Sequence, residues 1–516
     1  MLSSVSTIQP LTMPANLPDD INQLKQIIAQ LHQQVNDLSQ DNQTQAEEIS
    51  ELKTQVEYMR EQLNLSKSKR FGKQSEKVPR GTFNEAEQQA KAEPKHHKKG
   101  KQKLPEHLER ETRVYTLDAP VCDCCQQSMH ACGTQESEQL KIIPEKVSVI
   151  RHQQTKYACR SCEQTQTKSQ IITASKPAQP IPGSVASPQA LAAVVTAKYC
   201  DALPLYRQED ILKRGGLSIS RTTLANWCIK AGQIVEPMVA CFKQNLLAST
   251  VASADETTVQ VLDEPGKDAS SKSYMWVYRS GVFNAQPVVV YDYQPGRSHE
   301  YPKQFLQGFS GALQCDGYQA YDNIEHVTPV ACWAHARRKF NDAKTASPKK
   351  TGRAQKALCF ISKLYRIEEK AKDYSPDKRQ ALRQEAIPIL TQFKAWLDEA
   401  EPQLTPKSYI GKAVRYTLNQ WEKLIRYTDD GQLSIDNNHT ERDIRPFTTG
   451  RKNWLFSKTV KGAEASAILY SIVMTCRAND INPYYYFEKL FAELPQRESG
   501  ADLTDLLPWN VKQALD

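Results

Sequence analysis

The stretch "LLASTVASADETTVQVL", residues 246–262, begins a region in which apolar and polar residues alternate with a period of two. Two more stretches of the same kind follow it, "SYMWVYRSG" at 273–281 and "AQPVVVYDYQPG" at 285–296, and turn residues separate all three. Alternation of this kind between turns predicts β-strands. The region therefore opens with three successive strands.

The next segments add helices and two more strands. "SHEYPKQFL" (298–306) predicts a short helix, and "GALQCDGYQAY" (311–321) predicts a fourth strand that ends at Asp316. Another helix and the apolar "VTPVACW" (327–333) complete the order β-β-β-α-β-α-β. This is the order of the ribonuclease H-like fold. We therefore predict a multidomain α/β protein whose catalytic core is a mixed five-stranded sheet.

Three carboxylates occupy the places that such a core would use. Asp255 lies in the first strand, Asp316 ends the fourth, and Glu441 opens a late helix. Phosphodiester chemistry needs an activated water or hydroxyl and stabilised charge on two oxygens, and two Mg²⁺ ions about 3.5–4 Å apart provide both. We predict that these three residues hold two Mg²⁺ (or Mn²⁺) ions. Each acid alone would be read as a solvated surface group, so the prediction rests on their joint placement.

Cations surround Glu441 in "DNNHTERDIRPFTTGRKNWLF", residues 436–456. Those predicted to contact DNA phosphates are Arg442, Arg445, Arg451 and Lys452. The alternative for Arg442 is an ion pair with Glu441. A second cationic group lies in "CWAHARRKF" (332–340), where Arg337 and Arg338 are predicted to lie near DNA. The alternative for both groups is ordinary ion pairing at the surface.

Residues 21–66 carry a seven-residue repeat for more than five heptads. The repeat positions are Leu24, Ile28, Leu31, Val35, Leu38, Asn42, Gln45, Ile49, Leu52, Val56, Met59 and Leu63. A sustained repeat of this length predicts a left-handed coiled coil, and an asparagine at an a position favours a defined parallel pair. We therefore expect a homodimer or a larger assembly. The alternative is one helix folded back on its own chain.

The segment that follows is basic and contains cysteine pairs. Residues 67–110 are polar and charged, with 12 Lys or Arg against 4 acids between 64 and 103, which predicts a linker that contacts nucleic acid. In residues 111–172, two C-x2-C pairs are formed by Cys122, Cys125, Cys159 and Cys162. Four thiolates at these spacings can surround a structural zinc ion. The neighbouring Cys124 and Cys132 leave the choice of ligands open.

Residues 185–245 predict a helical region. Within it, Leu205–Arg214, a Gly215–Gly216 break and a helix capped by Ser220 resemble a helix-turn-helix. The side chains that could then face DNA are Arg221, Thr222 and Asn226. An ordinary helical hairpin fits the pattern equally well.

Composition sets the expected compartment. No apolar run reaches the roughly 18 residues of a membrane span, and the N-terminal segment 1–20, which we expect to be flexible, lacks the features of a signal peptide. We therefore expect a cytoplasmic protein without a membrane partner. Its 13 cysteines are then reduced thiols or metal ligands.

Several long motifs resemble those of bacterial transposases of the insertion-sequence-66 family. They are "RFGKQSEK", "CRSCE", "ADETTVQVL", "LQCDGYQAYD", "CWAHARRKF", "NNHTERDIRPFTTGRKNWLF" and "DLLPWN". The resemblance implies an N-terminal zipper, a zinc module, a DDE-type core at 246–340 and 430–480, a helical insertion at 341–429 and a C-terminal element at 481–516. The family's acidic triad then falls on Asp255, Asp316 and Glu441.

The resemblance also implies an activity and partners. The protein would bind transposon-end DNA, cleave it and join the freed 3′ ends to target DNA, with accessory proteins of the same element as further partners. One alternative is a structure-specific nuclease that uses the same core to cut without joining. The other is an inactive DNA-binding regulator built from the zipper, the zinc module and the helix-turn-helix.

Overall fold

The computed structural model describes residues 20–71, 147–157, 172–347 and 352–515. The four predicted zinc ligands lie outside these ranges, as does most of the predicted basic linker. The chain divides into two compact units. The helical unit comprises Met1–Thr82, His335–Ile367 and Gln384–Glu422, and the sheet unit comprises Phe83–Ala334, Glu368–Arg383 and Lys423–Asp516.

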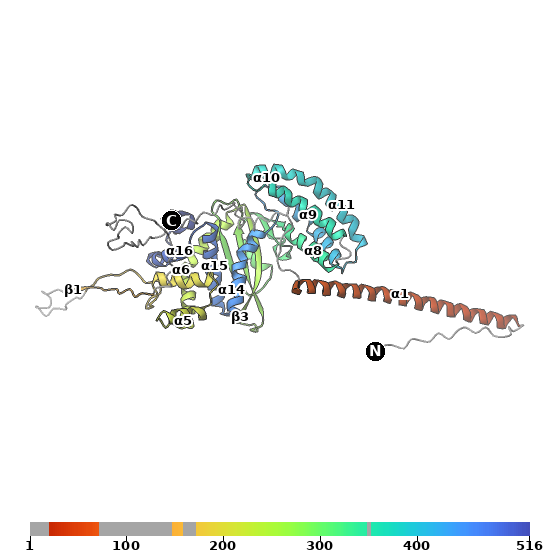
Figure 1. Cartoon of the computed structure of the whole chain (residues 1–516), viewed down its shortest axis with the longest axis horizontal. Helices are drawn as coiled ribbons and strands as arrows, with labels where there is room; N and C mark the ends of the chain where they lie inside the picture. The colour runs from red at the N-terminus through yellow and green to blue at the C-terminus, as the bar shows by residue number, and fades with distance from the viewer. Residues whose placement is uncertain (1–19, 72–146, 158–171, 348–351, 516) are drawn as a thin grey trace, which may run out of the picture. The chain divides into compact units, whose positions relative to one another are not determined.

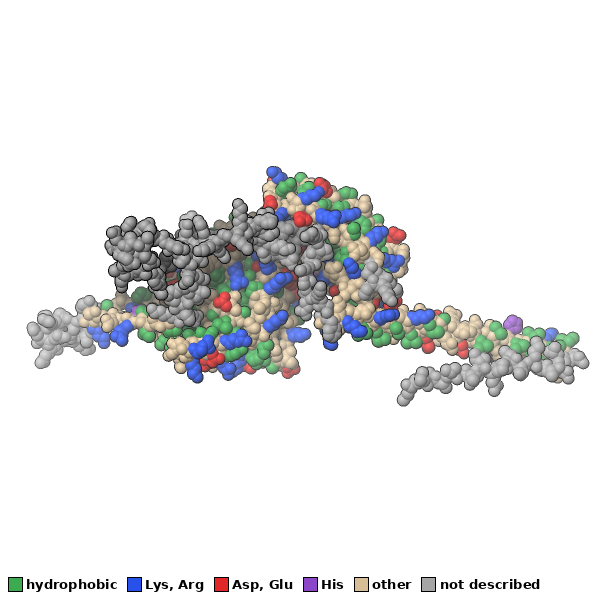
Figure 2. Space-filling model, in the orientation of Figure 1, with side chains coloured by type: hydrophobic (Ala, Val, Ile, Leu, Met, Phe, Trp, Pro, Cys, Tyr) green, Lys and Arg blue, Asp and Glu red, His purple; other side chains and the backbone are tan. Residues whose placement is uncertain are grey.

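In the helical unit, α1 (Ile21–Phe71) is one continuous helix, which confirms the predicted helix and extends it past residue 66. Most of its apolar repeat is exposed, and Figure 2 shows hydrophobic side chains along it. Among the described residues, its last turns pack against the rest of the unit, where the buried Glu61 accepts hydrogen bonds from the Ser347 hydroxyl (2.8 Å) and the Tyr409 N–H (3.0 Å). The end of α1 is therefore folded back on its own chain, whereas the earlier repeat remains exposed.

The predicted insertion is helical throughout its described residues. Its helices are α8 (Trp333–Ala346), α9 (Gly352–Lys370), α10 (Pro376–Arg383), α11 (Ile387–Ala400), α12 (Tyr409–Asn419) and α13 (Trp421–Ile425). An aromatic cluster forms the core of the helical unit, with the rings of Phe360 and Phe393 stacked at 5.0 Å and the Trp421 ring edge-on to Phe393 at 6.0 Å. Residues 368–383, which include α10, group with the sheet unit instead.

The sheet unit contains the mixed sheet predicted from the sequence. Its strands are β3 (Val251–Asp263), β4 (Lys272–Ser280), β5 (Val289–Gln294), β6 (Gly311–Cys315) and β7 (Val327–Ala331). They lie in the order β5-β4-β3-β6-β7, in which β3, β4 and β5 are antiparallel and β3, β6 and β7 are parallel. A short strand, β8 (Ser457–Thr459), pairs in parallel with the end of β3.

The connections differ from the prediction in two places. The helix α7 (Glu300–Phe305) follows β5 as expected, but only the three-residue 3₁₀ turn Gln319–Tyr321 lies between β6 and β7. The strand predicted from residue 246 is also wrong at its start, because α6 (Arg221–Leu247) runs to Leu247. Leu246 is fully buried on the inner face of α6, and an apolar pair satisfies a helix face as well as a strand.

Three helices of the sheet unit pack on the sheet: α6, α14 (Asn438–Trp454) and α15 (Val460–Ala478). Four more pack against helices: α4 (Pro188–Tyr199), α5 (Leu205–Arg214), α16 (Pro483–Glu493) and α17 (Pro508–Leu515). The helix α15 packs against β5 and α6 (Figure 1). Two N–H groups of the outer strand β5 donate to hydroxyls of α15. The Tyr291 N–H donates to Ser471 (2.8 Å), and the Val289 N–H donates to Thr475 (3.0 Å). The edge of the sheet is thereby satisfied within the chain.

The helix-turn-helix-like segment has the predicted local structure. The helix α5 has the predicted bounds, Gly216 adopts a positive φ of 85°, and the Ser220 hydroxyl caps α6 by accepting the Thr223 N–H at 3.2 Å. Figure 2 shows Lys and Arg side chains gathered over α5.

The antiparallel pair β1 (Lys156–Tyr157) and β2 (Ile172–Thr173) precedes this region. Among the described residues, no helix combines the length and apolarity needed to cross a membrane.

Candidate active site

The register of the sheet brings Asp255 and Asp316 to the same level. In the parallel pair of β3 and β6, Ser253 lies beside Gln314; Asp255 follows two residues later in β3, and Asp316 comes directly after Cys315, the last residue of β6. Neighbouring strands are about 4.8 Å apart, and residues separated by two positions share one face. The two carboxylates therefore start from adjacent backbone positions on one face of the sheet.

Glu441 reaches this edge of the sheet on α14, where it lies in the first turn, as predicted. Asn437, just before the helix, donates its side-chain N–H to the carbonyl of Ala254 at 2.9 Å. Its backbone N–H points to the sulfur of Cys332 at 3.2 Å. Because Ala254 directly precedes Asp255, the start of the helix is tied to β3 at the first carboxylate.

The electrostatics indicate that the three acids share one environment. Burial first, and then the negative charges of Glu256, Asp316 and Glu441, together raise the pKa of Asp255 to about 8, against a hydrogen bond from the Glu256 N–H (2.9 Å) that lowers it. Such a set of hard oxygen ligands fits a divalent cation. Within the described ranges, however, no three His, Cys, Asp or Glu side chains are already arranged to hold a metal ion. Binding an ion would therefore need the carboxylates to close around it.

A second acid beside Asp255 has a role that the sequence reasoning missed. The Glu256 carboxylate is nearly buried, pairs with Arg297 and accepts the Tyr321 hydroxyl at 2.6 Å. The Arg297 guanidinium lies 3.7 Å from the centre of the Tyr318 ring, and the Tyr318 N–H donates to the Asp316 carboxylate at 2.9 Å. Glu256 therefore holds the loop that follows Asp316, directly at Tyr321 and through Arg297 at Tyr318. The only sequence signal for this role is its position next to Asp255.

The segment that leads into α14 is held by a buried arginine that sequence reasoning also missed. The Arg383 side chain is fully buried and bonds the Glu368 carboxylate twice, each time at 2.7 Å. It also donates to three backbone carbonyls, those of Tyr427 (2.6 Å), Asp430 (2.8 Å) and Leu433 (2.7 Å). The chain that delivers Glu441 is thus fixed from α10, inside the predicted insertion.

Beyond this point the entry segment runs along the sheet. The side chain of Gln314 donates to the Ser434 carbonyl (2.6 Å) and accepts the Ser434 N–H (3.1 Å), so it binds this residue as a strand neighbour would. The Trp333 N–H donates to the Ile435 carbonyl at 3.1 Å. The position of Glu441 therefore depends on contacts with β6 and with the start of α8.

The opposite face of α14 is buried against the sheet. Asp443 forms an ion pair with Arg279 of β4, and its carbonyl accepts the Tyr291 hydroxyl of β5. Arg451 donates to the carbonyl of Thr258 and to the hydroxyls of Thr257 and Thr258, each at 3.2 Å. Desolvation lowers the pKa of this guanidinium. Arg451 thus ties α14 to β3 in this structure.

The other predicted DNA contacts differ in exposure. Arg445 and Lys452 are exposed on α14, and Arg442 is half-buried. Arg337 and Arg338 belong to the helical unit, where the Arg337 guanidinium lies 5.8 Å from the centre of the Tyr365 ring. Exposed cations on the helix that carries Glu441 are therefore Arg445 and Lys452.

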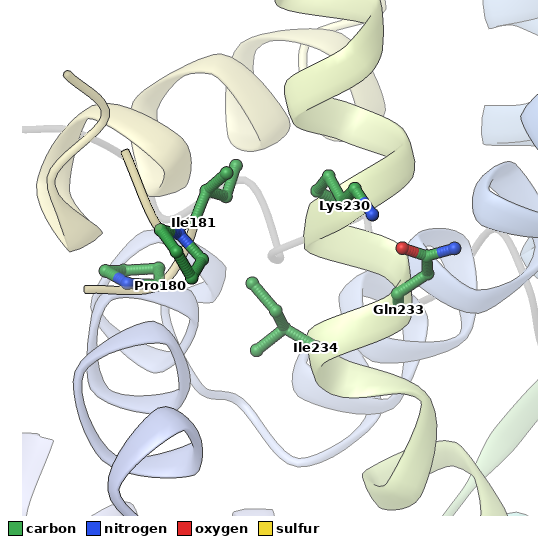
Figure 3. Close-up of a pocket in the computed structure, with 6 residues that line it drawn as sticks. Pro180, Ile181, Lys230, Gln233 and Ile234 are labelled. Carbon is green, nitrogen blue, oxygen red and sulfur yellow. The ribbon is translucent and has the colours of Figure 1, made fainter. Parts of the chain in front are cut away.

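The sheet unit also has a pocket of about 360 Å³ beside α6 (Figure 3). It is lined by Pro180, Ile181, Pro182, Lys230, Gln233 and Ile234. None of the predicted site residues lines it, and its walls contain no carboxylate. The candidate active site is consequently the sheet edge at Asp255 and not this pocket.

Three family models match this chain. Residues 183–465 match the family model "Transposase IS66 family", residues 120–163 match "zinc-finger binding domain of transposase IS66", and residues 471–509 match "IS66 C-terminal element". Two similar proteins are y4qI and y4jD of Sinorhizobium fredii (strain NBRC 101917 / NGR234), both described as uncharacterized. The protein y4qI is 32% identical to this chain, and the match covers 79% of this chain and 76% of y4qI. The protein y4jD is 30% identical, and the match covers 79% of this chain and 81% of y4jD.

A solved structure, the Drosophila P element transposase strand transfer complex, matches 56% of this chain and 92% of its own at 10% identity. Its TM-score is 0.31, which is too low to indicate a shared fold. The family matches, by contrast, extend over the sheet, the entry segment and the start of α15. The chain therefore belongs to the IS66 family of transposases.

Proposed function

We propose that this transposase cleaves transposon-end DNA and joins it to target DNA with Asp255, Asp316 and Glu441, on a ribonuclease H-like core. The observation that carries the proposal is the assembly of these acids from three distant segments at one sheet edge. The paired register of β3 and β6 supports it, as does the bond from Asn437 to the carbonyl next to Asp255. The raised pKa of Asp255 supports it as well.

In this proposal the three carboxylates hold Mg²⁺ (or Mn²⁺), which when bound activates the attacking oxygen and stabilises charge on the leaving oxygen. Asp255 and Asp316 are held by β3 and by the loop that Glu256 braces. Glu441 is set by the N-terminal turn of α14, which Asn437 ties to β3. The exposed Arg445 and Lys452 would bind phosphates of the DNA along α14.

We also propose a structural zinc site and a paired N-terminal helix. The zinc-finger family match at residues 120–163 supports zinc binding by Cys122, Cys125, Cys159 and Cys162. The exposed repeat of α1 supports pairing with α1 of a second copy. A groove of about 750 Å³ in the helical unit, between the Ile49–Val56 part of α1 and Ala346, would be part of that contact. Accessory proteins of the same element would be further partners.

The test is Mg²⁺-dependent cleavage and joining of labelled transposon-end DNA by the wild type and by Glu441→Gln. Losing about 4 kcal/mol of transition-state stabilisation should slow cleavage about a thousandfold, whereas binding to the end DNA should remain. Equal cleavage by both proteins would remove Glu441 from the site. Cleavage without joined products would favour a nuclease, and specific binding without cleavage, even with the accessory proteins present, would favour a regulator.

A further inference from the structure

The turn that follows α14 exposes two large apolar side chains. Leu455 is 63% exposed and Phe456 is 42% exposed. Leu455 also has a φ of 66°, in the left-handed region that residues with a side chain rarely adopt. Strained backbone of this kind persists only where the surrounding structure holds it, and it is concentrated at functional sites.

The contacts around the turn fix its backbone and leave its side chains outside. Asn453 donates to the carbonyl of Ala202 at 2.9 Å, in the turn before α5. Trp454 packs edge-on against the Phe447 ring at 5.6 Å, inside the sheet unit. On the other side, β8 pairs with the end of β3. The pair Leu455–Phe456 is therefore a rigid apolar tip, held from three directions.

The charge around the tip indicates the kind of partner. Between residues 451 and 463 the sequence has four cations and no acid. The exposed cations are Lys452, Lys458 and Lys461. An apolar side chain surrounded by cations matches the surface of proteins that insert a wedge between base pairs while binding the flanking phosphates. A surface that binds another protein would not require positive charges alone around the apolar side chains.

The tip also lies in line with the catalytic glutamate. Glu441, Arg445, Thr448 and Lys452 follow one another at spacings of four, three and four residues, which places them on one face of α14. The buried residues of the helix, including Ile444 and Phe447, are on other faces. The 14 residues from Glu441 to Leu455 span about 20 Å along the helix, or roughly six steps of 3.4 Å along a DNA strand.

We propose that Leu455 and Phe456 insert into the transposon-end DNA about six base pairs from the cleaved phosphate, with the Phe456 ring stacked on an unstacked base. This inference rests on the proposed function, because it assumes that the cleaved DNA lies along α14. The insertion would add a contact with DNA bases to the face of α14 whose exposed cations, Arg445 and Lys452, would bind phosphates. The expected consequence is a local opening of the duplex at a fixed distance from the cut.

The test uses the full-length protein and end DNA that carries 2-aminopurine at single positions from one to twelve base pairs on either side of the cut. Unstacking raises the fluorescence of this base. The wild type should give its largest rise about six positions from the cut, Phe456→Ala should lose that rise and bind the DNA about tenfold less tightly, and Phe456→Trp should restore both. The matched control is Tyr485→Ala, since Tyr485 is an equally exposed aromatic residue (50%) on α16.

Two results would overturn the inference. One is an unchanged fluorescence profile in Phe456→Ala with unchanged affinity. The other is a loss of self-association of the DNA-free Phe456→Ala protein in sedimentation, with the profile kept, which would assign the tip to a second copy. Including Glu441→Gln separates this inference from the proposed function, because that variant should keep the fluorescence rise and lose only cleavage.

Discussion

Replacing Arg383 by methionine should destabilise the sheet unit and misplace Glu441. The substitution leaves Glu368, which is 1% exposed, with one buried cationic neighbour, Arg379 at 3.0 Å. Removing one partner of a buried ion pair costs about 3–5 kcal/mol. Three carbonyls also lose a donor, each worth about 1 kcal/mol, although the loop at Asp430 can recover part of that from water. Because Arg379 still pairs with Glu368 and water replaces part of the lost donors, we expect a loss near the low end of this sum, about 4 kcal/mol.

Two measurements test this: the thermal unfolding transition, and the rate of DNA cleavage at temperatures below that transition. With an unfolding entropy of about 2.1 cal/mol/K per residue, a unit of roughly 300 residues loses about 1.5 °C in Tm for each kcal/mol, so Arg383→Met should melt about 6 °C lower. Below that temperature, DNA binding should remain near the wild-type level while cleavage slows, because the entry to α14 is no longer fixed. The matched control is Lys378→Met, an exposed cation on the same helix, which should change neither property.

A triple variant, Glu368→Leu with Arg379→Leu and Arg383→Met, removes the whole buried charge cluster. Replacing such a cluster with apolar residues is often neutral, so this protein should recover most of the lost Tm. It should still cleave slowly, because the carbonyls at the entry to α14 have no donor. A single Arg383→Met protein that melts within 2 °C of the wild type and cleaves normally would refute the reasoning.

Three further outcomes follow from the site. Asp255→Asn should melt higher than the metal-free wild type at pH 9 and should gain nothing from Mg²⁺. The folded pKa of about 8 lies above the ordinary carboxyl pKa of 3.8, so the wild type loses stability as pH rises between them; a lower Tm of the variant would contradict this. Glu256→Gln should keep the bond with Tyr321, weaken that with Arg297, and raise the Mg²⁺ concentration needed for half-maximal cleavage. Asn437→Ala should cost about 1–2 kcal/mol in urea unfolding and slow cleavage, and unchanged cleavage would remove its positioning role.

The strands and caps could be predicted because their signals are local. Period-two alternation gave β4 and β5 within a few residues, and the seven-residue repeat gave the long helix α1. Ser220 was recognisable as a helix cap because a hydroxyl before a helix accepts the N–H three residues later. In each case the residues that determine the structure are close together in the sequence.

The supporting residues of the site could not be predicted because their partners are distant. Arg383 is a charged residue on a short helix, where a solvated position is the usual expectation, and it is buried only because three carbonyls from residues 427–433 converge on it. Glu256 meets Arg297 across 41 residues of sequence. The start of the first strand was predicted wrongly for a different, local reason. The apolar residues at the end of α6 fit one face of a helix as well as they fit a strand.

The late position of Glu441 and α15 in the chain has a consequence for synthesis. The strand β5 donates two of its N–H groups to the hydroxyls of Ser471 and Thr475, and the third acid of the proposed site follows Asp316 by 125 residues. At about 5–20 residues per second, a ribosome needs roughly 6–25 seconds to pass from one acid to the other. A nascent chain therefore exposes the sheet before it can complete the acidic site. Fragments that end before residue 441 should accumulate as proteins unable to cut DNA, whatever DNA they bind.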